Sequence, residues 1–206
     1  MFDASVCRLC LVTDRVVARR PLAAIVEAAV RGGVTMVQLR EKTAGTREFL
    51  AHARELRALT SIFGVPLIIN DRVDIALGVG ADGVHVGQSD MPVADVRRLM
   101  GPAAIIGLSV SRAEFFANAD VEEADYLGIG PVYGQSTKPD ASPAHGPEGF
   151  VRMRRRTGKP VMAIGGLTPD NAGPVVAAGV AGLAVVSALC GADDPEAAAR
   201  AFRALF

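Results

Sequence analysis

Short apolar runs alternate with longer amphipathic runs along the chain. Most of the short runs are continuously apolar, as expected of parallel strands that are covered on both faces. Eight segments show this character: CRLCLVT (7–13), TMVQLR (35–40), PLIIN (66–70), GVHVG (83–87), AIIGLS (104–109), ADYLGIG (124–130), PVMAIGG (160–166) and GLAVVS (182–187). We interpret each of them as a buried strand.

The segments between these strands have helical length and carry apolar residues at helical spacing. Many end in glycine, which commonly terminates a helix. They are PLAAIVEAAVRGG (21–33), TREFLAHARELRALTSIFG (46–64), RVDIALGVG (72–80), PVADVRRLM (92–100), SRAEFFANAD (111–120), PEGFVRMRRRTG (147–158), TPDNAGPVVAAG (168–179) and DPEAAARAFRALF (194–206).

Eight strand–helix units in succession predict an α/β fold, a (β/α)8 TIM barrel that forms a single domain over residues 1–206. The alternative is a doubly wound open sheet. Polar motifs follow almost every predicted strand, and only a barrel brings all those strand ends to one mouth. We therefore favour the barrel.

Charge and composition exclude several classes of function. The 22 basic and 22 acidic residues cancel, which argues against a nucleic-acid partner or an anionic membrane surface. No apolar stretch reaches the roughly 20 residues that a membrane span needs, and the N-terminus lacks the pattern of a signal peptide. We expect a cytoplasmic protein, and the basic run 152–156 is interpreted as a solvated helix face.

Three cysteines fit that compartment, because so few do not make a disulfide framework. Cys7 and Cys10 form a C-x-x-C motif, but a redox motif of this kind normally opens a helix, whereas this one lies in a predicted strand. Residues three apart on a strand face opposite sides. We expect two packed cysteines.

Polar residues gather directly after the predicted strands. Following the chain, they are Gln38, Arg40 and Lys42, then Asn70 and Asp71, then Asp90, Ser109, the group Ser136, Thr137 and Lys138, the pair Gly165 and Gly166, and finally Ser187.

Two anion sites are predicted from this inventory. Asp71 and Asp90 suit Mg²⁺, which takes one or two carboxylates plus phosphate oxygens and waters. Arg40, Lys42 and Lys138 are cations that suit a pyrophosphate, and Asn70 and Ser109 add neutral hydrogen bonds. The Gly165–Gly166 turn and the Val186–Ser187 strand end match the usual barrel phosphate site, which backbone N–H groups line. Such a mouth suits the joining of a pyrophosphate-activated substrate to a phosphorylated one.

Each of these residues also has a simpler interpretation. Asp71 and Asp90 are good helix caps, and Lys42 and Lys138 suit a solvated loop. His85 either lines the barrel near the site or packs beneath it. His52 is expected on the surface or in packing.

The segment 130–146, GPVYGQSTKPDASPAHG, is too polar and too interrupted by proline and glycine for a helix or a strand. Connections of this length are usually functional or disordered. Because it carries Lys138, we interpret it as a flap over the barrel mouth.

With these motifs in view, the sequence resembles thiamine phosphate synthase over nearly its whole length. The pieces that carry the resemblance are QLREK, IINDRVDIAL, ADGVHVGQSD, ADYLGIGPVY, TKPDASPAHG, AIGGLTPDNA and GLAVVSAL, in the order and spacing of that family. The resemblance implies a barrel that uses Mg²⁺ to join hydroxymethylpyrimidine pyrophosphate to a thiazole phosphate. Thiamine phosphate and pyrophosphate would be the products, by a dissociative reaction.

The resemblance also implies roles for individual residues. Asp71 and Asp90 would hold the metal. The pyrimidine pyrophosphate would contact Gln38, Arg40, Lys42, Asn70, Ser109 and Lys138, of which Arg40, Lys42, Ser109 and Lys138 are the catalytic candidates. The thiazole phosphate would contact Thr137, Gly166, Val186 and Ser187.

The sequence departs from the family pattern at Gln135, where the family usually has threonine. Its amide could donate to the thiazole phosphate instead, or Ser136 could compensate. Two alternatives remain: a thiazole tautomerase that shares the barrel, and a non-catalytic thiamine phosphate binder. The tautomerase has no need for the two aspartates and two lysines kept here, and this chain has Pro131 where the tautomerase has histidine. Family members often form dimers, so the resemblance leaves a homodimer open.

Overall fold

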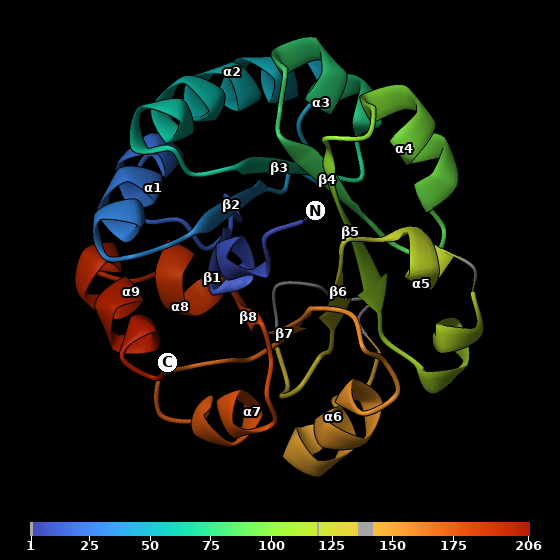
Figure 1. Ribbon diagram of the computed structural model, residues 1–206. Coiled ribbons are helices and arrows are strands. Elements are labelled where there is room, and N and C mark those ends of the chain that lie inside the picture. Colours follow the sequence, from blue (N-terminus) through green and yellow to red (C-terminus); the bar gives the residue numbers. More distant parts are fainter. Residues whose placement is uncertain (1, 119, 136–141) are drawn as a thin grey trace.

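Eight parallel strands close into a barrel in the computed structural model, and helices surround it as an outer ring (Figure 1). The structure describes residues 2–118, 120–135 and 142–206. Each strand pairs with the next along the chain, and β1 pairs with β8 to close the sheet. The predicted single-domain TIM barrel is confirmed, and the open-sheet alternative is wrong.

The strands are short and regular, which gives a lean barrel. They are β1 (Leu9–Val12), β2 (Met36–Leu39), β3 (Leu67–Asn70), β4 (Gly83–Val86), β5 (Ile105–Val110), β6 (Tyr126–Ile129), β7 (Val161–Ile164) and β8 (Gly182–Val185). The helices are α1 (Leu22–Arg31), α2 (Thr46–Phe63), α3 (Val73–Val79), α4 (Val93–Met100), α5 (Asp120–Glu123), α6 (Gly146–Arg154), α7 (Gly173–Ala177), α8 (Ser187–Cys190) and α9 (Pro195–Arg203). Two 3₁₀ helices, η1 (Ala4–Cys7) and η2 (Ala113–Ala117), accompany them.

Apolar side chains form two layers because successive residues of a strand face opposite sides. On β1, Leu9 and Leu11 belong to the large core between the barrel and the helices. Cys10 and Val12 belong to the smaller core inside the barrel, together with Met36 of β2. Burial on both faces explains why the strands appear in the sequence as continuous apolar runs.

The first predicted strand begins two residues late. Cys7 lies in η1, and β1 starts at Leu9. Cys7 and Cys10 are both buried and unpaired, as expected of packed cysteines. The expectation that they face opposite sides is wrong, because Cys7 precedes the strand and packs in the same inner core as Cys10.

The prediction of one helix over 111–120 is wrong. The chain forms η2 there, and α5 only begins at Asp120. The side chain of Asn118 accepts a hydrogen bond from the Asp120 amide and donates one to Gln88, so it competes with helical bonding. The helix predicted over 168–179 shortens to α7 for a similar reason, since Asn171 bonds the Thr168 amide in a turn.

η1 covers the end of the barrel at which the strands begin, opposite the mouth. Phe2 stacks on Tyr126 of the barrel interior with ring centroids 6.3 Å apart. This end is therefore closed by packing, and the opposite end carries the polar strand ends. No helix in the ranges that the structure describes has the length and apolar character needed to cross a bilayer.

Candidate active site

Arg40 lies at the end of β2 and is held by the preceding strand–helix loop. Its guanidinium donates to the Asp14 carboxylate at 3.1 Å, and its backbone amide donates to the Thr13 hydroxyl at 3.1 Å. Asp14 is buried, so the pair is shielded from water. Gln38, two residues earlier on β2, is also buried.

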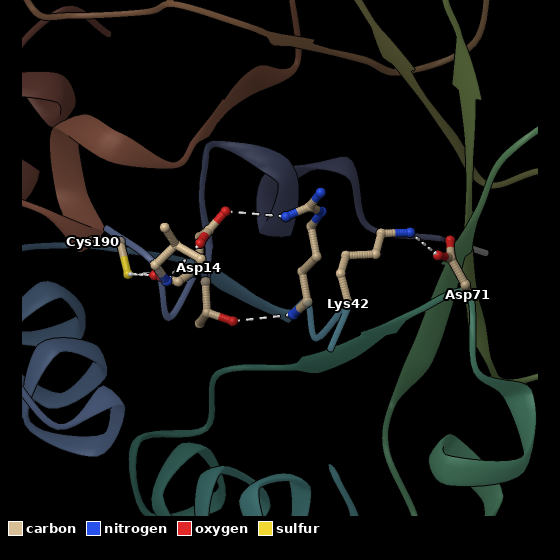
Figure 2. Close-up of polar contacts among 7 residues, drawn as sticks. Asp14, Lys42, Asp71 and Cys190 are labelled. Atoms are coloured by element: carbon tan, nitrogen blue, oxygen red, sulfur yellow. Dashed lines mark hydrogen bonds and ion pairs between the residues drawn. The ribbon is translucent and has the colours of Figure 1, made fainter. Parts of the chain in front are cut away.

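Lys42 and Asp71 point toward one another between the neighbouring ends of β2 and β3 (Figure 2), with Nζ and Oδ2 2.6 Å apart. Asp71 follows Asn70, the last residue of β3, and has a φ of +62°, a conformation that non-glycine residues seldom adopt. Its amide donates to the His85 carbonyl at 2.9 Å, which helps to hold this backbone. Backbone strain of this kind collects at functional sites.

Asp90 lies beside this pair, after β4. Partial burial raises its pKa, and the neighbouring Asp71 raises it further, whereas the Gly87 amide and Lys42 act in the opposite direction. The Gly87 amide donates to its carboxylate at 2.7 Å. Neither aspartate caps a helix, because Arg72 and Pro92 occupy the N-cap positions of α3 and α4. The capping interpretation is therefore wrong for both.

Two interacting carboxylates are a donor set that fits a hard divalent cation. Within the part of the chain that the structure describes, no three His, Cys, Asp or Glu side chains form a group that could hold a metal by itself. Mg²⁺ needs only one or two carboxylates when phosphate oxygens and waters complete its shell. Asp71 and Asp90 suit that mode of binding, which requires a phosphorylated ligand.

Ser109 of β5 is hydrogen-bonded to a buried side-chain network. His85 places Nε2 2.9 Å from the Ser109 hydroxyl and Nδ1 3.0 Å from the Tyr126 hydroxyl. Burial raises the pKa of Tyr126 well above its usual value, so the phenol keeps its proton. When that phenol donates to Nδ1, the imidazole carries its proton on Nε2 and donates to Ser109. The Ser109 proton is then available to a substrate oxygen.

His85 therefore lies inside the barrel, where it is buried and hydrogen-bonded to the candidate site residue Ser109. Glycines make room for it. A Cβ at Gly107 would lie 2.2 Å from Tyr126 and 2.3 Å from the His85 ring, and one at Gly128 would lie 3.1 Å from that ring.

The turn after β7 is fixed by side chains from two neighbouring loops. Gly165 and Gly166 both have positive φ, +102° and +64°. The amide of Asn171 donates to the Gly166 carbonyl at 2.9 Å, and the Tyr133 hydroxyl donates to the Asn171 carbonyl at 2.9 Å. Backbone groups of this turn are thereby held in one arrangement, as an anion site requires.

Val186 and Ser187 follow β8, where Val186 is the N-cap residue of the short helix α8. Ser187 is exposed. The last residue of α8, Cys190, contacts the backbone of Asp14 through its sulfur (Figure 2). The β8 and β1 strand ends are therefore joined beside the Arg40–Asp14 pair.

The predicted flap lies only partly within the described residues. Gln135 is half-buried and engaged in a contact, whereas Ser136, Thr137 and Lys138 lie outside the described ranges. The predictions for those three residues stay predictions.

Asp14 and Gln88 belong to the contacts of this site, although neither was predicted from the sequence. Asp14 follows β1 with Thr13 between them, so the rule that selected the other strand ends would have found it. Gln88 donates to the Ser109 carbonyl at 2.9 Å and accepts from Asn118 at 3.0 Å. No local signal distinguishes Gln88, because its partners come from more distant parts of the chain.

Comparison with known proteins gives a consistent family. Residues 9–189 match the family model described as thiamine monophosphate synthase. A thiamine-phosphate synthase of Albidiferax ferrireducens is 53% identical over 199 residues, covering 96% of this chain and 91% of that protein. One from Chloroflexus aurantiacus is 51% identical over 199 residues, covering 96% and 92%.

Comparison with solved structures points to the same family. A thiamine phosphate pyrophosphorylase from Pyrococcus furiosus superposes with a TM-score of 0.87 at 38% identity, covering 98% of this chain and 96% of that one. A 3-hexulose-6-phosphate synthase superposes with a TM-score of 0.66 at 19% identity, which is a likeness of fold alone.

Proposed function

Because the chain belongs to the thiamine monophosphate synthase family, a family of transferases in thiamine biosynthesis, we propose the specific reaction that it catalyses. It joins hydroxymethylpyrimidine pyrophosphate to a thiazole phosphate, and it releases thiamine phosphate and pyrophosphate. The observation that carries this proposal is the meeting of Lys42 and Asp71 across adjoining strand ends, next to Asp90.

Cations and carboxylates at one mouth suit a metal–pyrophosphate ligand. Lys42 and Asp71 neutralise each other without a ligand. A bound pyrophosphate would take over Lys42 as its counter-charge, and a bound Mg²⁺ would take over Asp71 together with Asp90. When bound, Mg²⁺ supplies positive charge to the leaving pyrophosphate oxygens.

The residues of the chain do the rest by charge and position. Arg40 and Lys42 stabilise the negative charge that grows on the pyrophosphate as its bond to the pyrimidine methylene breaks. Arg40 is ready for this role, because Asp14 orients its guanidinium. Ser109, oriented by His85, donates to a substrate oxygen, and Gln38 and Asn70 add further hydrogen bonds.

The reaction we propose is dissociative. Pyrophosphate leaves first, and the amino group of the pyrimidine ring stabilises the cation that remains. The thiazole nitrogen then attacks that cation. Little proton transfer is needed, so the site works by positioning and electrostatic stabilisation.

The second phosphate would bind on the other side of the mouth. We assign it to the backbone of Gly166, Val186 and Ser187, with Thr137 from the flap. The supporting observation is the rigid turn at Gly166, which Asn171 and Tyr133 hold. The pair Gln135–Ser136 completes this set from the same flap, whereas Lys138 of that flap is proposed to contact the pyrophosphate of the pyrimidine substrate.

The direct test incubates the protein with both substrates and Mg²⁺ and measures pyrophosphate and thiamine phosphate. We expect the two products in equal amounts, and none after chelation of the metal. Isomerisation of the thiazole without coupling would instead indicate a tautomerase. Binding of thiamine phosphate without turnover would indicate a non-catalytic binder.

The metal assignment is tested by Asp71→Asn and Asp90→Asn. Each should lower kcat by about 100-fold or more, as expected when a major electrostatic contribution is lost. The control is Asp95→Asn, which changes an aspartate of α4 that pairs with Arg98. Wild-type turnover and metal dependence in both site variants would contradict the assignment.

A further inference from the structure

Glu41 stands between the two cations Arg40 and Lys42 in the sequence but faces away from the mouth. Its carboxylate contacts His52 of α2, a helix of the outer ring, so it lies on the helix side of the barrel wall. Its side chain is only 3% exposed, although the two cations on either side of it serve the mouth. A carboxylate hidden at this position needs a physical reason, because burial of an unpaired charge is costly.

Three side chains from two other elements act on the Glu41 carboxylate, and His52 is the one in contact with it. His52 of α2 places Nδ1 3.4 Å from Glu41 Oε1. Arg15, from the loop after β1, attracts the carboxylate, whereas Glu48 of α2 repels it and is itself paired with Arg15. Burial raises the pKa of Glu41, and the attractions of Arg15 and His52 oppose that rise. Glu41, which lies in the loop after β2, therefore interacts with two other segments, the loop after β1 and α2.

The same two loops are also joined on the inner side. Asp14 binds Arg40 there, and Arg15, the next residue, pairs with Glu48 of α2 and attracts the Glu41 carboxylate. The backbone that carries Arg40 and Lys42 is thus held from both faces of the barrel wall. If the outer contact is lost, Arg40 keeps Asp14, whereas Lys42 depends on its half-exposed pairing with Asp71.

We propose that Glu41 is a positioning residue for pyrophosphate binding: its carboxylate, held against His52, fixes the backbone from which Arg40 and Lys42 reach the ligand. This inference rests on the proposed function, since it assigns Glu41 to the pyrophosphate half of that site. It gives a role to His52, which the sequence placed on the surface or in packing and whose Nδ1 lies 3.4 Å from the Glu41 carboxylate.

The test compares Glu41→Ala with Glu41→Gln. Glu41→Ala should raise KM for the pyrimidine pyrophosphate about tenfold by misplacing the two cations, and KM for the thiazole phosphate should stay within about twofold. Glu41→Gln keeps the size and an oxygen toward His52, so it should stay within about threefold of wild type in both. The matched control is Glu55→Ala, an exposed glutamate of the same helix as His52.

A double-mutant cycle identifies the contact. His52→Ala should raise the same KM by a similar factor, and adding it to Glu41→Ala should cost less than about a further twofold, because both changes remove one link. If the double variant raised KM by the product of the two single effects, the assignment of His52 as the partner would be overturned.

A binding measurement separates failure of this inference from failure of the proposed function. Calorimetry with inorganic pyrophosphate and Mg²⁺ should show about tenfold weaker binding to Glu41→Ala than to wild type. If the wild type makes no thiamine phosphate, the proposed function fails. If the wild type is active but Glu41→Ala matches Glu55→Ala in KM and in pyrophosphate affinity, the positioning role is overturned. An equal rise of both KM values with a lowered Tm would also overturn it, since it indicates a merely structural role.

Discussion

Two phenol hydroxyls support opposite sides of the barrel mouth, and they are the only tyrosines in the chain. Tyr126 bonds His85, which bonds Ser109 on the proposed pyrophosphate side. Tyr133 bonds the Asn171 carbonyl beside the Gly165–Gly166 turn on the proposed thiazole phosphate side. At the scale of single residues, the site therefore depends on side chains that need not touch a substrate.

Removing each hydroxyl should affect a different substrate. Tyr126→Phe should lower kcat/KM for the pyrimidine pyrophosphate by about three- to tenfold, the size expected for one lost hydrogen bond of about 1 kcal/mol. Tyr133→Phe should act on the KM of the thiazole phosphate instead. Steady-state kinetics with each substrate varied in turn checks this, and equal effects of both variants on both substrates would refute it.

Because of the buried cysteines, we expect the free energy of unfolding to depend on pH in the alkaline range. Burial raises the pKa of Cys7 from 9.0 to about 12 and raises that of Cys10 as well. The folded state thus keeps these thiols protonated while the unfolded chain begins to ionise above its ordinary thiol pKa. Because the unfolded state loses protons first, their contribution is complete below that pKa and declines as the pH rises past it.

We expect each of these thiols to lower the free energy of unfolding by at most about 1.4 kcal/mol between pH ~8 and pH ~10. Urea unfolding at the two pH values measures the loss. A Cys10→Ala variant should be less stable throughout but less sensitive to pH than wild type. An unchanged pH dependence in that variant would show that Cys10 does not contribute.

At the scale of elements, glycines in two strands leave the space inside the barrel that the polar network occupies. Gly107 of β5 and Gly128 of β6 flank His85 inside the barrel. The network of His85, Tyr126 and Ser109 joins three different strands, so it also ties β4, β5 and β6 together. The same glycines weaken the strands locally, since glycine loses more backbone entropy on folding than other residues.

Gly107→Ala should nevertheless destabilise the protein, although alanine normally costs less than glycine inside a strand. The added Cβ would come within 2.4 Å of the Tyr126 hydroxyl as well as close to His85. We expect a loss of about 1–3 kcal/mol in the free energy of unfolding, as in other overpacked cores, and a fall in kcat/KM for the pyrimidine pyrophosphate. Gly158→Ala is the control, because a Cβ there meets nothing within 4 Å.

At the scale of the whole molecule, closure of the barrel brings the loops after β1 and β8 beside those after β2 and β3. The Cys190–Asp14 contact joins residues 176 apart in the sequence, next to the Arg40–Asp14 pair. A ligand that binds the mouth therefore engages segments from much of the chain, and it should stabilise the fold as a unit.

Inorganic pyrophosphate with Mg²⁺ should accordingly raise Tm. At a free concentration of about 100 times Kd, the expected stabilisation is about 2.7 kcal/mol. Thermal unfolding with pyrophosphate alone, Mg²⁺ alone and both together measures it, and Asp90→Asn should lose most of the combined shift. A full shift in that variant, or with Mg²⁺ absent, would contradict metal-assisted binding at this mouth.

Much of the architecture was predictable because its signals are local. Continuous apolar runs, helical periodicity and terminal glycines identify eight strand–helix units, and the polar residues Arg40, Lys42, Asp71 and Asp90 come directly after strands. The local signals failed where a side chain competes with the helix, as Asn118 does before α5. They also misplaced Cys7, because an apolar run does not say where a strand begins.

The sequence by itself thus determined the barrel, the end at which its chemistry gathers and the types of residue found there. Only the tertiary structure decided which of those residues meet: Arg40 with Asp14, Lys42 with Asp71, Ser109 with His85, and Glu41 with His52. The physical reason is that periodicity depends on neighbours along one element, whereas these contacts join different elements. Their geometry is set by strand register and by the space that glycines such as Gly107 leave inside the barrel.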